Sequence, residues 1–130
     1  MAGELILVVE DNALNAKLLR DFLQAKGYRV IESTTAEKGL QLAREHGPDL
    51  ILMDIRLPGM NGVTALQELK RDEATRHIPV MAVTASVMPS ERDEFLAAGF
   101  DGYHAKPISV KGLLKEMCAF LDASSESHGD

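Results

Sequence analysis

The chain has 130 residues, 45% of them hydrophobic and 26% charged, which is the composition of a single soluble globular domain. The formal net charge of −6 disfavours direct nucleic-acid binding, and one cysteine allows neither an internal disulfide nor a cysteine-rich zinc site. The sequence contains no apolar run of the ~20 residues that span a membrane and no basic N-terminal signal, so we expect a cytoplasmic protein without membrane contact.

Short apolar runs recur along the chain and predict five strands. Three of them are continuously apolar, which is typical of strands buried on both faces of a parallel sheet: 5–9, 50–53 and 78–83. Two others have mixed polarity and predict strands at the edges of the sheet: 28–32 and 101–105.

Helix-like segments separate these runs. Apolar spacing and capping residues predict helices after Asn12, after Thr35, from Gly62, over 89–98 and from Val110. A strand followed by a helix, five times over, predicts an α/β fold with a doubly wound five-stranded parallel sheet flanked by five helices. Right-handed crossovers and polar edge strands favour the strand order 2-1-3-4-5. We expect the domain to cover 1–122, followed by a flexible tail at 123–130.

Polar residues stand where the inner strands are predicted to end. Glu10 and Asp11 follow the first strand, Asp54 the third, Thr84 the fourth and Lys106 the fifth. In open α/β sheets ligands bind outside the carboxyl ends of the strands, so we expect these side chains to converge. Three adjacent carboxylates repel one another unless a cation neutralises them. Oxygen donors favour a hard cation, which predicts Mg²⁺, with Mn²⁺ as a substitute.

Other kinds of site fit the residues less well. No glycine-rich loop follows the first strand, which disfavours a dinucleotide site and a flavin carrier. An aspartyl-phosphate phosphatase would carry a second aspartate two residues after Asp54, and the chain has Arg56 there. An interaction module that does not depend on phosphorylation stays open as an alternative.

Four stretches in this order resemble the receiver domain of two-component response regulators, over about residues 4–122: 7–12, 48–62, 79–85 and 106–108. The chain most resembles the DivK-type single-domain receivers of bacterial cell-cycle signalling, and receivers of hybrid histidine kinases are similar. The resemblance implies the flavodoxin-like fold of the chemotaxis regulator CheY.

The resemblance implies a function for each matching residue. Asp54 corresponds to the phosphoacceptor. Metal ligands are implied at Glu10, Asp11, Asp54 and the backbone carbonyl of Arg56, and phosphate-binding or switch positions at Thr84, Ala85, Lys106 and the aromatic Tyr103. The bond between Lys106 and Pro107 is implied to be cis. Glu10 departs from the aspartate that many members carry at its position.

The resemblance also implies partners. A sensor histidine kinase or a phosphotransferase protein would donate the phosphoryl group, and a downstream protein would bind the face formed by the fourth helix, fifth strand and fifth helix. The domain would be a phosphoacceptor rather than an enzyme, although it would assist its own phosphorylation and dephosphorylation. The receiver portion of a hybrid histidine kinase is an alternative assignment.

Overall fold

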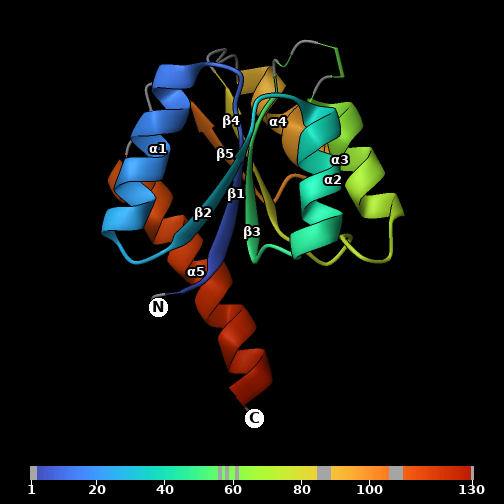
Figure 1. The fold of residues 1–130 in the computed structure, drawn as a ribbon. Helices are drawn as coiled ribbons and strands as arrows, with labels where there is room; N and C mark the ends of the chain where they lie inside the picture. The colour runs from blue at the N-terminus through green and yellow to red at the C-terminus, as the bar shows by residue number, and fades with distance from the viewer. Residues whose placement is uncertain are drawn as a thin grey trace.

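The computed structural model describes residues 3–55, 57, 59–60, 62–84, 89–105 and 110–129, without the side chains of residues 84, 89–92, 105, 110, 120 and 122–129. Strands and helices alternate along the chain (Figure 1). Their bounds are β1 Leu5–Val9, α1 Ala13–Ala25, β2 Arg29–Ser33, α2 Ala36–His46, β3 Leu50–Asp54, α3 Gly62–Arg71, β4 Val80–Thr84, α4 Pro89–Ala98, β5 Gly102–Ala105 and α5 Val110–Gly129.

The five strands form one parallel sheet in the order β2-β1-β3-β4-β5, which confirms the predicted α/β fold and topology. The two strands of mixed polarity lie at the edges, and the three continuously apolar strands lie inside. Successive residues of a strand point to opposite faces, so the apolar inner strands build a core on both sides of the sheet.

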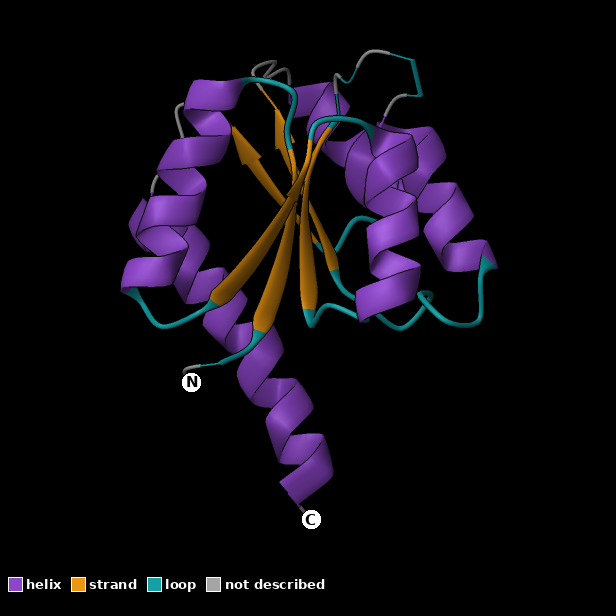
Figure 2. Cartoon of the chain, in the orientation of Figure 1, coloured by secondary structure: helices purple, strands orange, loops and turns teal. Residues whose placement is uncertain are grey.

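Two helical layers cover the sheet (Figure 2). Leu19 and Leu23 of α1 and Leu113 of α5 pack against one face, and the second core lies under α2 and α3 on the other. The predicted N-caps are present: Asn12 Oδ1 accepts a hydrogen bond of 3.0 Å from the Asn15 N–H, and Thr35 Oγ1 accepts one of 3.2 Å from the Lys38 N–H. These caps satisfy amides that a helix start leaves without partners.

The C-terminal helix extends past residue 122, where we expect the domain to end. α5 continues as helix to Gly129 and projects beyond the sheet (Figure 1), and the flexibility expected of 123–130 stays a prediction. Between residue 122 and Gly129 the chain has no proline and no other glycine, so no helix breaker ends α5 earlier. Among the described residues, no helix combines the length and apolar character needed to cross a bilayer.

Candidate functional site

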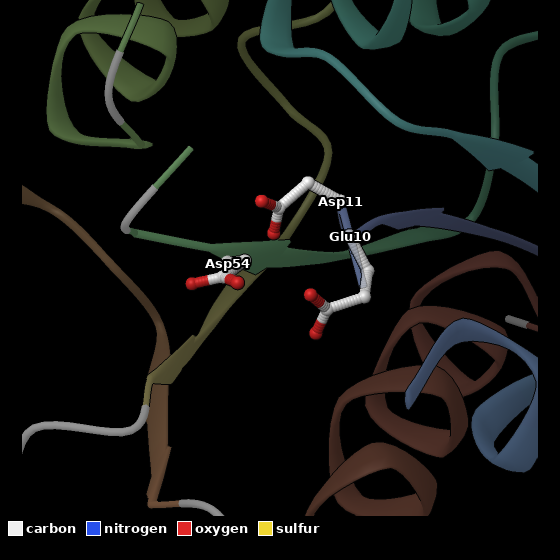
Figure 3. Close-up of side chains that lie close together, drawn as sticks. All are labelled: Glu10, Asp11 and Asp54. Atoms are coloured by element: carbon white, nitrogen blue, oxygen red, sulfur yellow. The ribbon is translucent and has the colours of Figure 1, made fainter. Parts of the chain in front are cut away.

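Three carboxylates meet at the carboxyl ends of β1 and β3. The two strands are parallel neighbours with Val9 opposite Met53, so the residues that follow, Glu10 and Asp54, stand at the same level of the sheet. One carboxylate oxygen from each of Glu10, Asp11 and Asp54 lies within 4.8 Å of the others. Figure 3 shows the three side chains grouped at this edge. The structure therefore brings together the three acids on which the sequence hypothesis depends.

Glu10 is held in place by the backbone around it. Its side chain is almost fully buried, and Glu10 Oε2 accepts a hydrogen bond of 3.1 Å from the Asn12 N–H. The Glu10 N–H donates to the Ser33 carbonyl over 2.9 Å, which extends the pairing of β1 with β2 by one residue. The longer arm of this glutamate thus folds back toward the start of α1.

Asp54 is the last residue of β3 and is 4% exposed, whereas Asp11 is exposed. The next residue, Ile55, still belongs to the sheet framework because its N–H donates to the Val83 carbonyl over 3.3 Å. The Ile55 carbonyl accepts a hydrogen bond of 2.8 Å from the N–H of Gly62, the first residue of α3. Asp54 is therefore fixed between β4 and the start of α3.

The donor set fits a hard divalent cation. Glu10, Asp11 and Asp54 offer only carboxylate oxygens, which are the ligands that Mg²⁺ prefers in proteins. Three like charges this close repel one another, and a bound cation offsets that repulsion. Exposed Asp11 gives solvent access to a group that is otherwise buried, as Mg²⁺ requires because it retains several of its waters.

The remaining residues of the hypothesis are only partly placed. Tyr103 lies on β5 and is half-buried, with its ring stacked on Phe95 of α4. Thr84 ends β4 and pairs with Ala105, but its side chain lies outside the described residues. Four further residues also lie outside them: Arg56, Ala85, Lys106 and Pro107. Their assigned functions therefore stay predictions.

The sequence analysis missed two residues that bear on the site. The packing of Gly62 on the end of β3 was not foreseen, because a glycine at a helix start also serves as an ordinary chain turn. The stack of Phe95 on Tyr103 was also missed, although Phe95, Phe100 and Tyr103 are half of the chain's six phenylalanines and tyrosines. Such clustering of aromatics was the available signal.

Comparison with known proteins agrees with this fold and gives the family. The model of the response regulator receiver domain matches residues 6–117, and the chain belongs to this family. It is therefore a signalling domain of two-component systems and not a classical enzyme. The resemblance found in the sequence is confirmed at the level of the family.

One relative by sequence and two solved structures show which members of the family this chain is similar to. The chain is 46% identical over 116 residues to the polar-differentiation response regulator DivK of Brucella ovis, covering 89% of this chain and 94% of the relative. Two solved structures are similar. One is the receiver domain of a Pseudomonas aeruginosa sensor histidine kinase with a magnesium ion in its active site cleft (TM-score 0.85, 34% identity, 93% of this chain and 99% of that one). The other is a response regulator of Chloroflexus aurantiacus (TM-score 0.87, 28% identity, 92% and 98%).

Proposed function

We propose that Asp54 accepts a phosphoryl group from a phosphohistidine of a partner kinase or phosphotransferase protein, and that this chain acts as a DivK-like single-domain response regulator. The observation that carries the proposal is the grouping of Asp54 with Glu10 and Asp11 at the carboxyl ends of neighbouring inner strands. Asp54 is nearly buried and held from both sides, which suits a nucleophile that must be positioned rather than mobile.

The transfer is a substitution at phosphorus. A carboxylate oxygen of Asp54 attacks the phosphorus, the P–N bond to the imidazole breaks, and an acyl phosphate forms. Hydrolysis later breaks the P–O bond, releases inorganic phosphate and restores the carboxylate. Phosphoryl transfer demands mainly positioning and charge stabilisation. A rigid acidic site at the sheet edge can provide both by holding the nucleophile and a cation in place.

Glu10, Asp11, Asp54 and the backbone carbonyl of Arg56 are the proposed ligands of Mg²⁺, which Mn²⁺ would replace. When bound, this ion supplies positive charge that neutralises the oxygens of the phosphoryl group. Thr84, Ala85 and Lys106 are the proposed contacts to those oxygens, with a cis bond before Pro107. The magnesium ion coordinated in the active site cleft of the Pseudomonas relative supports the choice of metal.

The proposed output is a change in protein contacts. Tyr103 would respond to the phosphoryl group and alter the face formed by α4, β5 and α5, where a downstream protein would bind. The 46% identity to a polar-differentiation response regulator supports a place in bacterial cell-cycle signalling. The proposed location is the cytoplasm. The similarity to the receiver of a sensor histidine kinase favours a second candidate, the receiver portion of a hybrid kinase.

Phosphorylation of the purified chain tests the proposal. Incubation with Mg²⁺ and acetyl phosphate, or with a phosphorylated histidine kinase, is expected to add one phosphoryl group on Asp54, detected by intact-protein mass. Asp54→Asn should abolish the addition. Asp49→Asn is the matched control, because Asp49 stands at the opposite end of β3 and its Oδ2 accepts a hydrogen bond of 2.8 Å from the Leu5 N–H, which asparagine can also accept. Unchanged labelling of Asp54→Asn would refute the site.

A further inference from the structure

Helix α4 is held weakly along its described length. Of its residues 93–98, five are exposed and Phe95 alone is half-buried. Leu96, the other large apolar residue of this segment, is 38% exposed. Few buried apolar contacts mean low local stability, so the attachment of this segment depends on Phe95.

Phe95 makes two defined aromatic contacts. Its ring stacks on Tyr103 of β5, with centroids 5.8 Å apart and planes inclined by 21°. Its edge contact with Phe100 has centroids 6.3 Å apart and planes inclined by 84°. Phe100 is buried in the core beneath α2 and α3, whereas Tyr103 and Phe95 only border that core. Tyr103 is thus the less constrained partner of Phe95.

The C-terminal end of α4 is fixed by hydrogen bonds. The Phe100 N–H donates to the Phe95 carbonyl over 3.3 Å, after Gly99 turns the chain with a φ of +118°. Asp101 then bonds twice to Val80, its N–H donating to the Val80 carbonyl and its Oδ2 accepting from the Val80 N–H, each over 2.8 Å. The C-terminal end of α4 is therefore fixed to β4. The rest of the helix is positioned on the sheet mainly by the contacts of Phe95.

We propose that Phe95 is the positioning residue that couples α4 to Tyr103, so that a change in the Tyr103 side chain alters the stability of α4 through this stack. The inference rests on the proposed function in one respect, because phosphorylation of Asp54 is the event that would change the Tyr103 side chain. The coupling itself is a property of the unphosphorylated chain and is measured without phosphate.

Amide hydrogen exchange of the α4 segment in the full chain tests the coupling. Phe95→Leu and Tyr103→Leu each keep an apolar side chain but remove the ring stack, and should speed α4 exchange by about 2- to 10-fold. The double variant should exchange no faster than the faster single variant, because both remove the same contact. Leu96→Ala, a change at the exposed neighbour on the same helix, should match the parent.

Unchanged α4 exchange in Phe95→Leu, or effects of the two single variants that multiply in the double variant, would overturn the coupling. A second arm adds Mg²⁺ with beryllium fluoride, a phosphoryl mimic. The mimic should change α4 exchange in the parent and much less in Phe95→Leu. In a separate reaction with Mg²⁺ and acetyl phosphate, both proteins should take up a phosphoryl group on Asp54. An equal response in the two proteins also overturns the inference. Failure of the parent to be phosphorylated would instead overturn the proposed function, and the first arm would still decide the coupling.

Discussion

Gly62 at the start of α3 lies directly against the backbone of Asp54: a methyl group on Gly62 would stand 2.9 Å from the Asp54 carbonyl oxygen and 2.7 Å from the Ile55 Cα. Backbone atoms this close cannot yield without moving either the strand end or the helix. The glycine therefore permits the contact that fixes Asp54.

Replacing Gly62 with alanine should lower the free energy of unfolding by about 1–3 kcal/mol, because overpacking outweighs the better helix propensity of alanine. Urea denaturation measures the change. Gly39→Ala in α2 is the matched control: its added methyl would stand 2.8 Å from the Val9 Cγ2, which belongs to a side chain rather than the backbone. A loss at Gly39 equal to that at Gly62 would contradict this explanation.

The acidic cluster predicts opposite effects of one substitution with and without metal. Asp11→Asn removes a charge from three close carboxylates, so in the absence of divalent ions it should raise stability, by up to about 1 kcal/mol for an exposed group. In millimolar Mg²⁺ the parent should gain thermal stability and the variant should gain much less, because ligands that bind the folded state stabilise it. Thermal unfolding with and without Mg²⁺ measures both.

Asp93→Asn makes the same charge change on the exposed surface of α4 and serves as the control. It should leave the gain from Mg²⁺ unaltered. If Asp11→Asn and Asp93→Asn respond alike to the metal, the cluster is not where the ion binds.

His104 on β5 predicts a loss of stability in acid. Burial lowers the pKa of His104 below its ordinary value of 6.5, and the nearby Glu116 only partly opposes this. The His104 side chain is 12% exposed, and its Nε2 lies 3.5 Å from the Glu116 Oε2 on α5, while Val83 of β4 is its neighbour in the sheet. The unfolded chain therefore takes up this proton at a higher pH than the folded one. Stability is complete above about pH 6.5 and is lost as the pH falls toward the lower folded value.

The free energy of unfolding, measured from about pH 7.5 to about pH 5, gives the contribution of His104 to stability. This range spans the ordinary histidine pKa of about 6.5. His104→Gln should flatten the decline, since glutamine does not titrate. His46→Gln, at the exposed end of α2, is the control and should follow the parent. Identical slopes for the parent and His104→Gln would show that His104 does not contribute.

Two leucines on α1 predict where the phosphoryl donor docks. Leu14 and Leu18 are 65% and 60% exposed and lie one helical turn apart, three and seven residues after Asp11. Exposed apolar pairs beside a reactive site favour contact with a partner protein. Replacing both with serine should slow phosphotransfer from the kinase by about fivefold or more, if together they contribute about 1 kcal/mol.

Labelling by acetyl phosphate should not change in that variant, because a small donor needs no docking surface. Leu96→Ser removes an exposed leucine from α4 instead and should leave both rates intact. Equal slowing with the kinase and with acetyl phosphate would place the fault in the site and not in docking.

The sequence predicted the fold and strand order because burial on both faces leaves a continuous apolar signal, as in 50–53, and because polar residues mark the edge strands. It also predicted that Glu10, Asp11 and Asp54 meet, since parallel strands end at a common edge of the sheet. Periodicity did not reveal contacts between elements, such as Gly62 on β3 or Phe95 on Tyr103. These contacts depend on how closely each helix packs against the sheet. The pattern of apolar residues along one sequence does not give the distance between a helix and the sheet.

The hydrogen bond from the Asn12 N–H to Glu10 Oε2 holds a glutamate at the position where the family resemblance implies aspartate in many members. A glutamate has more rotatable bonds than an aspartate, so immobilising it as a ligand costs more conformational entropy. Here the N–H of Asn12, the residue before α1, already holds the Glu10 carboxylate in the folded chain, so part of that entropy is lost on folding and not on metal binding. The Glu10 carboxylate is preorganised for the proposed metal ion. Binding of that ion should therefore also make the residues at the start of α1 more rigid.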